Sequence, residues 1–191
     1  MTTLFDEYRR KLKAILLQRS VKTGTFTLTS GRQSDFYVDV KQTSLTAEGA
    51  FLIGKLMYHM VQQNDVPIKA VGGMTLGADP IVTAISLASY TNREAIPAFI
   101  VRKEAKGHGT NNFIEGLDNF SGGPDTHVAI VEDVCTTGGT LLKVIDRIHE
   151  QGISVGLIMT VVDRQEGATE ALAARGYLLQ SIFTREELLA K

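Results

Sequence analysis

The stretch VAIVEDVCTTGGT, residues 128–140, decides the fold because it reads as a buried strand, a turn and the start of a helix. Two adjacent acids, Glu132 and Asp133, follow the apolar run where the strand should end. The residues after the acids are Val134, Cys135, Thr136, Thr137, Gly138, Gly139 and Thr140. In open parallel sheets, ligands bind beyond the carboxyl ends of strands, so this position favours a ligand site over a plain turn.

Strands and helices alternate on either side of this stretch. We expect helices over 4–19, 46–63, from 79, 141–148 and 168–175, and strands over 68–73, 96–102, 127–133, 154–163 and 177–183. FTLTSGRQSDFYVDV, residues 26–40, predicts a hairpin, and Asp79-Pro80 predicts an N-cap followed by the first helical residue. The pattern therefore predicts an α/β fold with a parallel sheet and flanking helices.

Size and composition fit one domain over residues 1–191, since 43% of the 191 residues are apolar. The 20 Lys+Arg nearly balance the 21 Asp+Glu, so no nucleic acid or anionic membrane surface is expected as a partner. One cysteine, Cys135, excludes an internal disulfide, and no apolar run approaches the ~20 residues of a membrane span. We expect a cytoplasmic protein.

The 128–140 stretch has two chemically different halves. Amides at the start of a helix lack intrahelical partners and attract phosphate, and glycines let the backbone approach it closely. The two acids repel phosphate and suit sugar hydroxyls or a hydrated Mg²⁺ instead. A phosphorylated sugar satisfies both halves, although acids that cap the helix before an ordinary turn remain an alternative.

Two further segments carry potential anion ligands. VRKEAKGHG, residues 101–109, places Arg102, Lys103, Lys106 and His108 at the start of a polar stretch of about 24 residues, 103–126, which is longer than an ordinary connection. Such cations suit a polyphosphate, although a solvated surface cluster is the alternative. VVDRQEG, residues 161–167, places Arg164 beyond a strand, where it can grip a planar carboxylate or form an internal ion pair.

Together these motifs resemble the type I phosphoribosyltransferases. The acid pair and Thr/Gly turn are similar to the motif that binds 5-phosphoribosyl-1-diphosphate (PRPP), and VRKEAKGHG with FTLTSGRQSDFYVDV and VVDRQEG resembles the orotate phosphoribosyltransferases. The resemblance spans nearly the whole chain. It implies the α/β type I phosphoribosyltransferase fold, a small N-terminal hood within about residues 1–45, and a mobile catalytic loop over about 103–126.

The resemblance also implies a reaction. The 5-phosphoribosyl group of PRPP is transferred to orotate, giving orotidine 5′-monophosphate and pyrophosphate in pyrimidine (UMP) biosynthesis. Mg²⁺ is the implied cofactor, held by PRPP and water with no direct protein ligand. A homodimer is implied, with Lys103 reaching the neighbouring site. A purine phosphoribosyltransferase, which would not need Arg164, and a PRPP-binding regulator without turnover are the alternatives.

By the same resemblance, each motif receives a role. The implied catalytic residues are Lys106, His108 and Asp133. The implied PRPP ligands are Arg102, Lys103, Lys106, His108 and residues 132–140, and the implied orotate ligands are Thr136, Arg164 and Tyr37. The implied pyrophosphate loop is Gly72, Gly73, Met74 and Thr75, with a non-proline cis peptide near Met74-Thr75. Thr29 and Leu76 stand where some relatives carry lysine.

Overall fold

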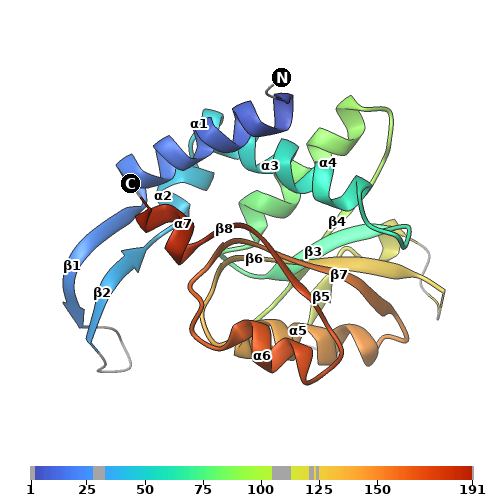
Figure 1. The fold of residues 1–191 in the computed structure, drawn as a ribbon. Helices are drawn as coiled ribbons and strands as arrows, with labels where there is room; N and C mark the ends of the chain where they lie inside the picture. The colour runs from blue at the N-terminus through green and yellow to red at the C-terminus, as the bar shows by residue number, and fades with distance from the viewer. Residues whose placement is uncertain (1–2, 28–32, 105–112, 121–122, 124, 191) are drawn as a thin grey trace.

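The computed structural model describes residues 3–27, 33–104, 113–120, 123 and 125–190 (Figure 1). Its centre is a six-stranded sheet in the order β5-β4-β3-β6-β7-β8. The strands are β3 (Ala70–Met74), β4 (Ala98–Val101), β5 (Ile114–Glu115), β6 (His127–Cys135), β7 (Ser154–Asp163) and β8 (Leu179–Thr184). All neighbours pair in parallel except β5, which runs antiparallel to β4.

Helices cover both faces of this sheet (Figure 1). They are α1 (Leu4–Arg19), α2 (Lys41–Ser44), α3 (Ala47–Gln62), α4 (Asp79–Thr91), α5 (Gly139–His149), α6 (Ala168–Ala173), α7 (Arg185–Leu189) and the short 3₁₀ helix η1 (Leu117–Asn119). One core cluster joins the sheet to α1, α3 and α4, and a second joins it to α5 and α6. The predicted α/β architecture with a mainly parallel sheet is confirmed.

The helix predictions were mostly accurate because the signals are local. Helix α1 has the predicted bounds, and Thr46 caps α3 by accepting a hydrogen bond from the Gly49 amide. The N-cap prediction at Asp79 was wrong. The helix already includes Asp79, the cap is Ala78, and the Asp79 carboxylate instead accepts a 2.7 Å hydrogen bond from the Thr75 hydroxyl.

The predicted hairpin is present and longer than expected. Strand β1 (Val21–Thr27) pairs antiparallel with β2 (Gln33–Val38), and the predicted Ser30-Gly31 turn lies outside the described residues. Phe36 of β2 is fully buried in the core that also holds α1 and α3. The hairpin is therefore attached to the main body through its second strand.

The segment 103–126 is not one continuous loop. In its described part, Ile114 is 2% exposed and belongs to β5, which pairs with Val101 at the edge of the sheet. Residues 117–119 then form η1. The predicted loop was too long because a two-residue strand among Asn and Gly residues leaves no periodic pattern.

Candidate active site

The two acids lie near the carboxyl end of β6, which continues two residues beyond them to Cys135. Glu132 is 8% exposed and Asp133 is 9% exposed. Both carboxylates accept hydrogen bonds from the backbone: Glu132 Oε1 from the Asp133 amide at 3.2 Å, and Asp133 Oδ1 from the Val134 amide at 2.9 Å. The strand itself therefore fixes the acids.

Glu132 has a strongly shifted acidity. Burial, together with the hydrogen bond and negative charge of Asp133, raises the pKa of Glu132 to about 8, while the Lys103 ammonium acts in the opposite direction. At neutral pH without ligand, the Glu132 carboxyl is therefore largely protonated. Protonation of Glu132 lowers the repulsion between the two adjacent acids.

Asp133 meets two other parts of the chain that sequence reasoning did not connect with it. The Lys41 ammonium lies 3.4 Å from Asp133 Oδ2 and 3.0 Å from Asp39 Oδ1. A Cβ placed on Gly77 would lie 2.5 Å from Asp133 Oδ1, so only glycine leaves room for the carboxylate there. A lysine after a hairpin gives no signal that its partner lies 92 residues later in the chain.

The turn after β6 forms the predicted amide cradle. Gly138 adopts a left-handed φ of 79°, and α5 begins at Gly139 without a side-chain cap. Within the described residues, no backbone or side-chain acceptor bonds the amides of Thr136, Thr137, Gly139 or Thr140. These residues and Glu132 line a polar hollow of about 90 Å³. The protein leaves this group of donors accessible to an anion.

Cys135 lies under this turn and is 2% exposed. Burial, together with the charges of Asp163 and Glu132, raises the pKa of its thiol to about 12. Because the thiolate is the nucleophilic form, this cysteine is a poor nucleophile at neutral pH. Its side chain supports the turn from below.

The predicted pyrophosphate loop needs correction. Gly72, Gly73 and Met74 belong to strand β3 and are buried, so the turn comprises residues 75–78. The non-proline cis peptide joins Thr75 and Leu76, one bond later than predicted. Leu76, where some relatives carry lysine, is 73% exposed. The two glycines on which the loop prediction was based therefore lie within the sheet.

The predicted cations are only partly described. The Arg102 guanidinium forms a 3.1 Å ion pair with Glu115 across the β4–β5 edge, which directs it to the sheet margin. Lys103 is exposed, and its ammonium lowers the pKa of Glu132 in the same chain. Lys106 and His108, as well as Thr29, lie outside the described residues.

Arg164 lies at the predicted position beyond β7 and is 7% exposed. Its guanidinium contacts Glu166 at 2.7 Å and donates to the Phe36 carbonyl oxygen at 3.3 Å. The internal ion pair that was left open as an alternative is therefore present. Tyr37, which follows Phe36 in β2, is 39% exposed, so the hood brings an aromatic ring and Arg164 to the same part of the molecule.

The fold, the acid pair and the amide cradle define a type I phosphoribosyltransferase. The family model described as "Phosphoribosyl transferase domain" matches residues 41–178. Orotate phosphoribosyltransferase of Aquifex aeolicus is 44% identical over 184 residues, covering 95% of this chain and 97% of the relative. The corresponding enzyme of Thermosynechococcus vestitus is 43% identical, covering 96% of this chain and 94% of the relative.

A solved structure agrees with these relatives. Mycobacterium tuberculosis orotate phosphoribosyltransferase in complex with PRPP has a TM-score of 0.77 and 35% identity, covering 95% of this chain and 98% of that one. The chain belongs to the orotate phosphoribosyltransferases, the PRPP-dependent transferases of pyrimidine synthesis. The predicted family is confirmed, in preference to a purine enzyme or a regulator.

Proposed function

We propose that this chain transfers the 5-phosphoribosyl group from PRPP to orotate through the site at the carboxyl end of β6. The observation that carries the assignment is the buried acid pair directly before an accessible amide cradle. In this proposal the 5′-phosphate binds the amides and hydroxyls of residues 136–140, because helix-start amides and their dipole favour an anion. Glu132 and Asp133 receive the ribose hydroxyls.

The remaining ligand groups are assigned to the surrounding elements. The pyrophosphate end of PRPP lies toward the 75–78 turn and Lys103, because Gly77 contacts Asp133 and the Lys103 charge acts on Glu132. Orotate lies under the hood with its carboxylate at Arg164, which exchanges Glu166 for the substrate, and its ring beside Tyr37. Thr136, Lys106 and His108 keep their predicted roles as part of this proposal.

The reaction breaks the bond between the anomeric carbon and pyrophosphate and forms a bond from that carbon to the orotate ring nitrogen. Positive charge develops on the ribose, where the negative Asp133 stabilises it. Negative charge develops on the leaving pyrophosphate, where the Lys103 ammonium stabilises it. Orotate supplies the nucleophile, so the protein contributes position and electrostatics, with no covalent intermediate.

The residues present fit Mg²⁺ that arrives with PRPP. Among the described residues, no group of three or more His, Cys, Asp or Glu side chains is arranged to hold a metal ion. Magnesium keeps several waters and is commonly bound through substrate phosphates, so PRPP and water could hold it without a direct ligand from the protein. When bound, the ion would neutralise charge on the pyrophosphate.

An orotate-dependent assay of pyrophosphate release, with and without Mg²⁺, tests this function. We expect release with orotate and PRPP, strong dependence on Mg²⁺, and none when adenine, guanine or xanthine replaces orotate. Release with a purine in place of orotate would contradict the assignment, as would PRPP binding without any turnover.

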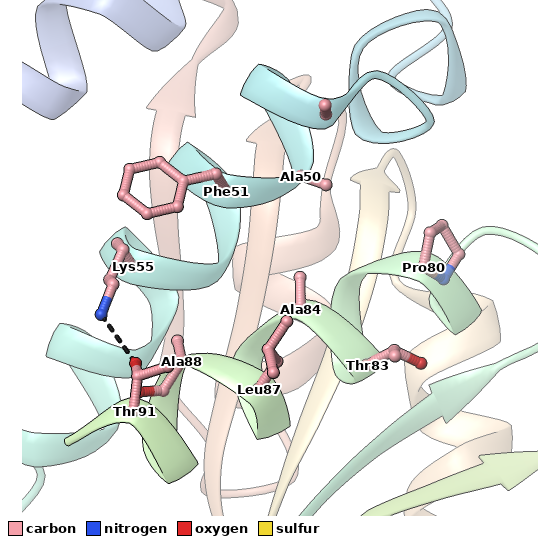
Figure 2. Close-up of a pocket in the computed structure, with 10 residues that line it drawn as sticks. Ala50, Phe51, Lys55, Pro80, Thr83, Ala84, Leu87, Ala88 and Thr91 are labelled. Carbon is pink, nitrogen blue, oxygen red and sulfur yellow. Dashed lines mark hydrogen bonds between the residues drawn. The ribbon is translucent and has the colours of Figure 1, made fainter.

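A homodimer is part of the proposal, with the exposed face of α3 and α4 as its interface. Phe51, Leu87 and Tyr90 are 50%, 64% and 73% exposed, and Phe51 and Leu87 line an apolar hollow between the two helices (Figure 2). Clustered exposed apolar side chains mark interaction surfaces. We propose that Lys103 acts in the site of its own chain, as an alternative to the predicted reach into a neighbouring site.

Sedimentation of a matched pair of variants tests the interface. Leu87→Glu should shift the protein toward monomer, whereas Leu178→Glu should not, although Leu178 is 80% exposed and lies away from these helices. If both variants sedimented equally, the interface would have to lie on another surface.

We also propose one domain over residues 1–191, since the hood residue Phe36 shares the core of the sheet. Within the described part of the chain, every helix is too short or too polar to traverse a lipid bilayer.

A further inference from the structure

Arg147 makes an unusual set of contacts for a residue in the last turn of a helix. From α5 its guanidinium donates hydrogen bonds to two successive carbonyl oxygens, those of Arg102 and Lys103, the second at 3.1 Å. It lies 4.0 Å from the ring centroid of Phe113 and 3.9 Å from the sulfur of Met74. One side chain therefore joins α5 to the ends of β3 and β4 and to the residue before β5.

The geometry suits arginine in particular. Side chains on a helix lean toward its N-terminus, so a long residue in the last turn of α5 extends toward the carboxyl ends of the strands. The planar fork of a guanidinium can serve two neighbouring carbonyl oxygens while its face lies on an aromatic ring. A lysine could supply the charge but not this combination.

These contacts fix the backbone that carries Lys103. The Arg102 amide also donates to the Phe113 carbonyl oxygen at 2.7 Å, and the Arg102 side chain pairs with Glu115. Arg102 and the Lys103 carbonyl are therefore held by surrounding residues, whereas the Lys103 side chain is exposed. Strands β4 and β6 both pair in parallel with β3, so residue 103 and the acid pair lie toward the same carboxyl edge of the sheet, and the Lys103 ammonium lowers the pKa of Glu132.

We propose that Arg147 is a positioning residue for PRPP use: it holds residues 102 and 103 so that the Lys103 ammonium faces the pyrophosphate end of the substrate. The inference rests on the proposed function for the identity of that substrate. Arg147 itself does not contact the acid pair or the amide cradle. Its effect passes through Lys103, which makes the proposal separable from a general role in stability.

A double-mutant cycle tests this pathway. Arg147→Met should lower kcat/KM for PRPP by about tenfold, because a small displacement of a charged group costs that order of rate. In a Lys103→Met background the same change should lower kcat/KM by less than about twofold, since the group being positioned is already gone. Arg147→Lys should fall between, and Lys143→Met on the exposed side of α5 should match the unsubstituted chain.

Binding and stability measurements separate the outcomes. PRPP affinity by calorimetry should fall in Arg147→Met, with orotate affinity unchanged and the same melting temperature within about 2 °C. An equal tenfold loss in both backgrounds would overturn the proposal, because Arg147 would then act independently of Lys103. Unchanged kcat/KM in Arg147→Met would also overturn it. Absence of orotate-dependent turnover in the unsubstituted chain would instead refute the proposed function, while the PRPP affinities would still test Arg147.

Discussion

Two Gly-Gly pairs lie in neighbouring strand-and-turn segments of this sheet, and they solve different problems. A Cβ on Gly72 would lie 2.1 Å from the Phe99 ring, and one on Gly73 would lie 2.1 Å from the Val131 carbonyl oxygen. Gly138 instead needs its left-handed φ of 79°, and a Cβ on Gly139 would have its nearest neighbour at 3.9 Å. The first pair provides space inside the protein, and the second provides a turn with accessible amides.

The difference shows that glycine content alone does not identify an anion site. Both pairs lie near the start of a helix, and both were predicted to bind a phosphate group of PRPP. Only Gly138-Gly139 lies in a turn, because β6 ends at Cys135, whereas β3 continues to Met74. Substitutions in the two pairs should therefore divide cleanly between effects on folding and effects on ligand binding.

Gly73→Ala should have the largest effect. The added methyl group would collide with backbone, which cannot move aside as a side chain can, so we expect a loss of about 3 kcal/mol in the free energy of unfolding. Urea denaturation of the purified protein measures this. A loss below about 1 kcal/mol would mean that β3 and β6 separate more easily than the described packing implies.

The next effect concerns Glu132, beside the second pair. Its pKa is about 8 in the folded chain and 4.5 as its ordinary value, so the folded state binds more protons between these limits. The stabilising contribution is complete below pH 4.5 and is lost as pH rises through 8. Between pH 6 and pH 8 the expected loss is about 2 kcal/mol.

Urea denaturation of the unsubstituted chain and of Glu132→Gln at both pH values isolates this contribution, because other titrating groups are shared. The difference between the two proteins should grow with pH. If their stabilities changed in parallel, Glu132 would already be ionised in the folded protein at pH 6, and its buried setting would not raise its pKa.

Gly138→Ala should lower the free energy of unfolding by less than Gly73→Ala. A residue with a side chain in the left-handed conformation loses about 1 kcal/mol, and the new methyl group would lie 3.3 Å from the Ala168 Cα, a tight contact that requires only a small shift. Thermal unfolding of this variant beside Gly73→Ala compares the two pairs directly. A larger loss for Gly138→Ala than for Gly73→Ala would reverse the comparison.

Gly139→Ala should have the smallest effect on folding, within about 0.5 kcal/mol, because alanine fits the start of a helix. Its methyl group would extend toward the cradle, so the KM for PRPP should rise by about tenfold while the KM for orotate stays the same. Steady-state kinetics with each substrate varied separately gives this result. An unchanged KM for PRPP would show that the phosphate does not bind next to Gly139.

The parts of the structure that the sequence predicts are those whose causes are local. The helix over residues 4–19 and the Thr/Gly turn both depend on residues within a few positions of one another. The sequence also predicted that an acid pair would precede the amide cradle. The apolar run of β6 and the glycines before α5 are the local signals for this arrangement.

What the sequence did not predict depends on contacts between distant segments. The Lys41 pair with Asp133, the reach of Arg147 to residues 102 and 103, and the Arg102 pair with Glu115 each require the folded sheet to bring strands together. The need for glycine at position 72 also depends on a distant residue, because the Phe99 ring occupies the space that a Cβ on Gly72 would take. Side-chain packing of this kind has no periodic signature.

The inert thiol beneath the turn has a practical consequence. Cys135 is the single cysteine of the chain, and it is both buried and held in its protonated form at neutral pH. Maleimide dyes react with accessible thiolates, so they should not label Cys135. A cysteine introduced on the surface, for example in place of Lys143, would accept one fluorophore per chain in the otherwise unaltered protein, ready for fluorescence measurements.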